Sequence, residues 1–120
     1  MKLLGIDHVH VLVRDLALSK SFFEFLGFAY DPSLTGHVDA VGLRASQGGV
    51  FLELQTVKPA ENPGWNHIAL LVEDLDAAVK ELDEAGVRYE GPVNAPSGRR
   101  IVNLRDPSGF LWQLVDARHR

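Results

Sequence analysis

The chain has 120 residues, of which 46% are hydrophobic and 23% charged, and its formal net charge is −4. This balance is typical of a folded globular domain and excludes a disordered chain. The acidic surplus argues against a nucleic-acid partner, and the lack of cysteine excludes disulfides and thiolate metal sites. No apolar run approaches the length of a membrane span, so we expect a cytoplasmic protein without a membrane partner.

The first strand is expected over residues 5–13, where β-branched residues alternate. Side chains of a strand point alternately to its two faces, so His8, His10 and Leu12 share one face. The valines between them occupy the other face. One face of the first strand therefore carries two imidazoles.

Two helices are expected, each beginning after an aspartate N-cap and ending at a glycine suited to a left-handed C-cap. They are predicted over 16–26, between Asp15 and Gly27, and over 75–85, between Asp74 and Gly86. The other strands, recognised from alternation and turn residues, are predicted at 28–30, 38–45, 50–56, 65–72, 87–89, 99–105 and 110–115.

The sequence repeats itself at about half its length. IDHVHVLVRDL near the N-terminus aligns with WNHIALLVEDL, which places His8 on His67, and GGVFLELQ aligns with SGFLWQLV, which places Glu53 on Gln113. Such a repeat predicts two copies of one supersecondary unit. We expect two βαβββ modules, about 1–57 and 64–117, within a single domain spanning 1–120.

The repeat brings four potential metal ligands into two equivalent pairs. By strand parity His8, Glu53, His67 and Gln113 all belong to the concave face of the predicted sheet. Imidazole nitrogens with carboxylate and amide oxygens suit a divalent transition metal such as nickel, zinc, cobalt, manganese or iron. The competing interpretation is a pair of hydrogen-bonded structural histidines.

His10 has no counterpart in the repeat, because Ala69 occupies the matching position. We interpret His10 as a wall of the site or a proton carrier, with a structural role favoured.

With these four residues in place, the chain resembles the vicinal oxygen chelate superfamily, which includes glyoxalase I, methylmalonyl-CoA epimerase, extradiol dioxygenases, fosfomycin resistance proteins and bleomycin-binding proteins. The resemblance implies an α+β fold in which two tandem βαβββ modules form an open, cup-like curved mixed sheet with helices on the outer face. It also implies a homodimer and metal ligands at the positions of His8, Glu53, His67 and Gln113.

Gln113 departs from the family pattern, since glyoxalase I, extradiol dioxygenases and fosfomycin enzymes usually carry glutamate there. An amide cannot serve as a base, so the catalytic base is expected to be Glu53. Glutathione-dependent glyoxalase I is disfavoured, because Leu12 and Val57 stand where bacterial enzymes of that kind carry arginine and asparagine.

The predicted concave face also contains candidate substrate-binding residues. Aromatic and aliphatic side chains there would accept an apolar body, and arginines at the rim would bind a carboxylate or phosphate. The candidates are His10, Phe51, Trp65, Arg99, Asn103 and Arg105. A solvated strand edge is the competing interpretation for the two arginines.

The leading hypothesis is a metal-dependent enzyme, of lyase or isomerase type or similar to a dioxygenase. It would act on a small substrate with neighbouring oxygens through a stabilised enolate or oxyanion. The first alternative is a metal-free protein of the bleomycin-resistance type that sequesters an aromatic drug or natural product. A second is a degenerate member with a structural histidine pair. A homodimer is expected, and the sequence leaves open whether the site lies within one chain or across two.

Overall fold

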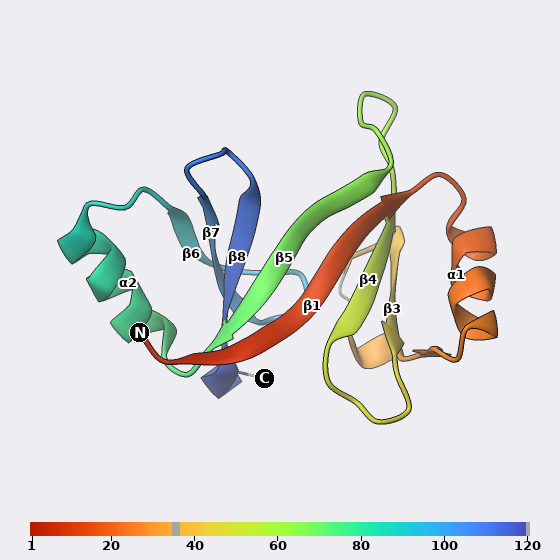
Figure 1. Cartoon of the computed structure of the whole chain (residues 1–120), viewed down its shortest axis with the longest axis horizontal. Coiled ribbons are helices and arrows are strands. Elements are labelled where there is room, and N and C mark those ends of the chain that lie inside the picture. The colour runs from red at the N-terminus through yellow and green to blue at the C-terminus, as the bar shows by residue number, and fades with distance from the viewer. Residues whose placement is uncertain (35–36, 120) are drawn as a thin grey trace. The chain divides into compact units, whose positions relative to one another are not determined.

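The computed structural model describes residues 1–34 and 37–119, and its elements follow the order βαβββ twice (Figure 1). The first set is β1 (Leu3–Val13), α1 (Leu16–Phe25), β2 (Ala29–Tyr30), β3 (Ala40–Arg44) and β4 (Phe51–Thr56). The second set is β5 (Gly64–Val72), α2 (Leu75–Ala85), β6 (Glu90–Asn94), β7 (Arg100–Arg105) and β8 (Leu111–Asp116). The α+β class and the tandem βαβββ order are confirmed.

The eight strands form a mixed sheet in the hydrogen-bonded order β2-β3-β4-β1-β5-β8-β7-β6. In each set the first and last strands pair in parallel, β1 with β4 and β5 with β8. The hairpins β2–β3, β3–β4, β6–β7 and β7–β8 are antiparallel. The registers also correspond, because His10 faces Glu53 across one parallel pair and Ala69 faces Gln113 across the other.

The chain divides into two compact units. The N-terminal unit is His8–Asn66, and the C-terminal unit combines Met1–Asp7 with the chain from His67 onward. Both β1 and β5 cross from one unit to the other, since each strand contains a division point. The first seven residues therefore belong to the same unit as the second helix.

In the N-terminal unit, α1 packs over the side of β1 and β4 that faces away from the histidines. Leu16 and Phe23 of the helix pack against a buried cluster of Val13, Leu43 and Leu54. Asp15 caps the helix by accepting a hydrogen bond from the Leu18 amide at 3.0 Å. The predicted parity of β1 and β4 is thus confirmed, with Val11 and Val13 of β1 and Leu52 and Leu54 of β4 directed toward the helix. The C-cap differs from the prediction, because Leu26 ends the helix in a right-handed conformation and Gly27 follows it.

In the C-terminal unit, α2 begins and ends at the predicted residues. Asp74 accepts from the Ala77 amide at 3.1 Å, and Gly86 closes the helix in the left-handed region with φ of 69°. The inward side of the helix packs on β5, β7 and β8 in a core of Val72, Leu75, Ala78, Leu82, Val102 and Leu114. Among the described residues, no helix is long and apolar enough to cross a membrane.

The strand predicted at residues 87–89 is wrong, since β6 spans Glu90–Asn94. The residues directly after Gly86 form hydrogen bonds with the last turn of α2 instead of pairing with β7. The Val87 amide donates to the Leu82 carbonyl at 2.9 Å, and the Tyr89 hydroxyl donates to Asp83 at 2.6 Å. Pairing with β7 begins only after these contacts, at Glu90 opposite Asn103.

Candidate functional site

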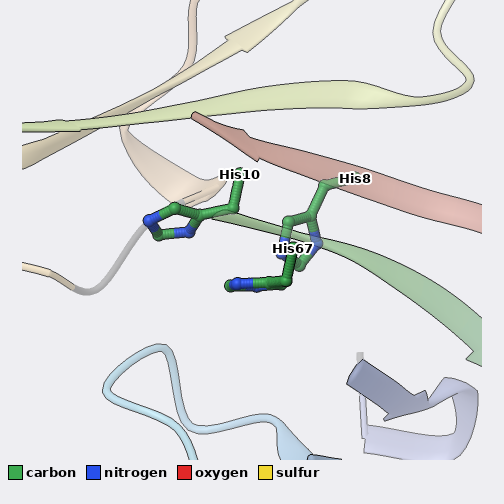
Figure 2. Close-up of side chains that lie close together, drawn as sticks. All are labelled: His8, His10 and His67. Atoms are coloured by element: carbon green, nitrogen blue, oxygen red, sulfur yellow. The ribbon is translucent and has the colours of Figure 1, made fainter. Parts of the chain in front are cut away.

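The face of β1 opposite α1 carries His8 and His10, both buried (Figure 2). The parallel register with β4 places Phe51 beside His8 and Glu53 beside His10, and both of these neighbours are buried too. The predicted sharing of one face by the histidines and Glu53 is confirmed. The N-terminal unit therefore contains a buried carboxylate among imidazoles.

Glu53 makes its shortest contact with His10, whose Nδ1 lies 2.7 Å from Glu53 Oε1. The other ring nitrogen, Nε2, donates to Gln55 Oε1 at 2.9 Å. Both oxygens are acceptors, so His10 lies between a carboxylate oxygen and an amide oxygen.

His37 and His8 complete the surroundings of this carboxylate. His37 Nε2 lies 3.7 Å from Glu53 Oε1. The ring of His8 stacks on Phe51 at 4.8 Å between centroids with an interplanar angle of 25°. Phe51 is therefore covered by an imidazole and is 1% exposed, while its predicted role in substrate binding stays a prediction.

The electrostatics of this cluster favour an ionised Glu53. Burial raises the pKa of its carboxyl, but the hydrogen bond with His10 and the electrostatic effects of His10, His8 and His37 lower it by more, so the net pKa lies below the ordinary value. The group is thus a carboxylate at neutral pH. A buried carboxylate of this kind can accept a proton or bind a cation.

The C-terminal unit contains the other two predicted ligands, His67 on β5 and Gln113 on β8, both half-buried. Gln113 Nε2 donates to Asn103 Oδ1 at 3.3 Å across the β7–β8 pair. The bond uses the nitrogen of the Gln113 amide, and the carbonyl oxygen Oε1 of the same amide takes no part in it. Asn103, predicted to bind substrate, here orients a predicted ligand.

Arg99, predicted as a rim residue for an anionic group, is bound to a carboxylate of its own unit. Its Nη1 and Nη2 donate to the two oxygens of Asp7 at 2.7 and 2.9 Å. The side chains of Asp7 and Arg99 are 0% and 14% exposed. Sequence reasoning did not single out Asp7, because its partner is far along the chain.

Arg105, the other predicted arginine, lines a cavity of about 630 Å³ in the C-terminal unit. Its Nη1 donates to the Gly109 carbonyl at 2.9 Å, and the guanidinium stays exposed. The cavity is lined by Val87, Arg88, Tyr89, Glu90, Asn103, Leu104, Arg105 and Leu111.

Trp65, predicted as a wall of the site, is 75% exposed on β5.

Comparison with known proteins assigns the family. Residues 5–114 match the Glyoxalase/Bleomycin resistance protein/Dioxygenase superfamily, so the chain belongs to that superfamily. The resemblance seen in the sequence is thereby confirmed. A curated relative, the uncharacterized protein YaeR of Escherichia coli K12, is 30% identical in an alignment of 122 positions that covers 92% of this chain and 95% of YaeR.

Solved structures share the same fold. The methylmalonyl-CoA epimerase of Mycobacterium tuberculosis aligns with a TM-score of 0.77 and 22% identity, over 95% of this chain and 88% of the epimerase. The Streptomyces coelicolor methylmalonyl-CoA epimerase with the substitution E43L, in complex with 2-nitronate-propionyl-CoA, aligns with a TM-score of 0.71 and 23% identity, over 99% of both chains. At these identities the likeness is one of fold.

Proposed function

We propose that this protein is a metal-dependent enzyme that moves a proton on a small substrate bearing two neighbouring oxygens, by lyase or isomerase chemistry. The observation that carries the proposal is Glu53, an ionised carboxylate that is buried between histidines on the face of β1 and β4 that points away from α1. Burying a charged group costs free energy unless the group is paired. Glu53 is paired with His10, and we propose that its function is proton transfer.

The potential ligands on β1, β4, β5 and β8 are of the kinds that bind a divalent transition metal. We assign His8, Glu53, His67 and Gln113 as its ligands, two imidazoles with a carboxylate and an amide oxygen. His8, His10 and His67, drawn in Figure 2, offer three imidazole nitrogens as a second possible set. When bound, such an ion supplies a Lewis acid that stabilises negative charge on the substrate oxygens.

The side chains around the proposed metal have separate roles in binding and proton transfer. Glu53 is the base, because Gln113, its counterpart in the repeat, is an amide and takes no proton. The His10 and His37 contacts both go to Oε1 of Glu53, so Oε2 is assigned to take the proton from the substrate. His10 holds the carboxylate in place through Nδ1. Asn103 orients Gln113 so that its carbonyl oxygen is the group presented to a ligand.

Metal content tests this proposal directly. We expect protein purified without chelator, and then offered nickel, zinc, cobalt, manganese and iron in turn, to retain one of them at close to one ion per chain by mass spectrometry of the metals. His8→Ala should lose most of that metal, whereas His119→Ala, which changes a histidine outside the proposed ligand set, should retain it. Failure of the unmodified protein to retain any of the five metals would exclude the metal-dependent enzyme.

A metal-free binding protein for an aromatic drug or natural product is the second candidate, favoured by the exposed ring of Trp65. An accessible indole can stack on a flat or cationic guest. This function predicts that bleomycin changes the tryptophan fluorescence in the presence of EDTA as strongly as in its absence, and that His67→Ala leaves the titration unchanged. A response abolished by EDTA or by His67→Ala would instead support the metal site.

A further inference from the structure

The cavity of the C-terminal unit lies at the edge of the sheet, beside the segment 87–89 that joins α2 to β6 (Figure 1). Strand β6 begins to pair with β7 at Glu90, opposite Asn103. The preceding segment is instead hydrogen-bonded to α2 through Val87 and Tyr89. Strand β7 therefore extends beyond the start of β6, and the cavity of about 630 Å³ is lined by residues of both segments at this point.

The cavity has the size and part of the lining of a small-molecule site. Val87, Leu104 and Leu111 supply aliphatic surface, and Tyr89 supplies an aromatic ring. The ring is held in place, because its hydroxyl donates to Asp83 of α2 at 2.6 Å. Pockets for small organic molecules typically span roughly 300–1,000 Å³ and are mostly apolar with a few polar groups. An apolar or aromatic body of modest size therefore fits here.

The two arginines of the cavity are not neutralised by carboxylates. Among the described residues, neither Arg88 nor Arg105 forms an ion pair, and Glu90, which also lines the cavity, forms none either. Four other arginines each lie 2.7–3.2 Å from an aspartate oxygen, namely Arg44, Arg99, Arg100 and Arg118. A guanidinium that lines a cavity without a carboxylate partner is available to an anionic ligand.

The charges of the lining favour a ligand with a single negative charge. Two arginines and one glutamate give the lining a net charge of +1, which a monoanion complements and a dianion exceeds. Arg105 is also held in position, because its Nη1 donates to the Gly109 carbonyl at 2.9 Å. A side chain that is already ordered loses less conformational entropy when a ligand binds. A carboxylate, which accepts paired hydrogen bonds from a guanidinium, suits such a site.

We propose that this cavity binds a monoanion, a carboxylate on an apolar or aromatic body, and that Arg88 and Arg105 bind the carboxylate. Arg99, the other arginine expected to bind an anion, is bound to Asp7 instead. As a statement about the substrate class, the proposal rests on the proposed function. The connection is Asn103, which lines the cavity and accepts the hydrogen bond of the Gln113 amide. Binding of the carboxylate itself requires no metal.

Titration with phenylacetate in the presence of EDTA, followed by proton–nitrogen NMR, tests the cavity. The amide resonances of Glu90 and Leu104 should shift with a dissociation constant of roughly 1 mM, which suits a ligand of about ten non-hydrogen atoms. Phenylacetamide, a neutral molecule of the same shape, should bind about tenfold more weakly or worse, because it forms no charge-assisted hydrogen bonds. Equal binding of the two compounds, or no shift at about 10 mM phenylacetate, would overturn the proposal. Tighter binding of phenyl phosphate than of phenylacetate would overturn the assignment of a monoanion.

Substitution of the arginines tests their role in the same titration. Arg88→Met and Arg105→Met should each weaken phenylacetate binding about tenfold or more, with an unchanged circular dichroism spectrum, since both side chains are exposed. Arg14→Met, the same change at an exposed arginine outside the cavity, should bind as the unmodified protein does. Full affinity in both cavity variants would contradict the proposal. Because EDTA is present, failure to bind phenylacetate refutes the cavity alone, whereas failure to retain a metal refutes only the proposed function.

Discussion

Glu53→Gln is expected to slow exchange of the α-hydrogen of methylmalonyl-CoA, used as a probe thioester, by about 10²- to 10⁴-fold, the usual contribution of a general base. Glutamine keeps the size of the side chain and removes its ability to accept a proton. The exchange can be followed by proton NMR in heavy water with the metal-loaded protein. The same variant should also bind the metal more weakly, because an anionic ligand becomes neutral.

The pH dependence of this exchange has a defined direction. The net pKa of Glu53 lies below its ordinary value, because the hydrogen bond with His10 and the electrostatic effects of the neighbouring histidines outweigh the effect of burial. The base is therefore ionised throughout the neutral range. The rate should fall only as the pH drops through this lowered pKa, at a more acidic pH than an ordinary glutamate would give. A fall beginning near neutral pH would assign the base to another group.

The control for this prediction is Glu73→Gln, the same chemical change at an exposed carboxylate that pairs with Lys2 at 3.5 Å. Its exchange rate should match that of the unmodified protein. If Glu53→Gln also retained the full rate, Glu53 would not be the base.

Arg99→Met is expected to lower the free energy of unfolding by about 3–5 kcal/mol, the cost of removing one partner of a buried ion pair. Asp7 would keep a carboxylate whose side chain is 0% exposed without the two hydrogen bonds from Arg99. Urea unfolding followed by circular dichroism measures the change. The exposed pair of Lys2 and Glu73 is the matched control, since Lys2→Met should cost no more than about 1 kcal/mol.

The double substitution Asp7→Leu, Arg99→Met distinguishes two causes of lost stability, the broken ion pair and the lost packing of the Arg99 side chain. Replacing both members of a buried pair by apolar residues is often close to neutral, so we expect the double variant to regain much of the stability lost in Arg99→Met. If the double variant were as unstable as the single one, the packing of Arg99 would be the source of the loss. In that case the ion pair would contribute little.

Local rules were sufficient for much of the fold. Helix α2 has the predicted limits because its signals, Asp74 and Gly86, act on the backbone immediately beside them. Strand parity correctly separated the histidine face of β1 from its valine face, because alternation is a property of one strand. The repeat supplied the βαβββ order of the second half once the first half had been recognised.

The contacts of the candidate site depend on pairing between distant strands, which local patterns do not specify. The β1–β4 register makes His10, rather than His8, the direct neighbour of Glu53. Sequence reasoning had placed Glu53 and His8 in one ligand set and left His10 outside it, because His10 has no counterpart in the repeat. The bond between Arg99 and Asp7 joins positions 92 residues apart. It could be recognised only once the structure had placed the start of β1 in the same unit as Arg99. The four predicted ligands remain a prediction.

The division of the chain inside β1 has a consequence for any attempt to separate the two repeats. A fragment of residues 1–57 would contain Asp7, and a fragment starting at residue 64 would contain Arg99 without the carboxylate that binds it in the intact chain. A cut at the joint of the repeat would therefore split a buried charge pair between the two fragments.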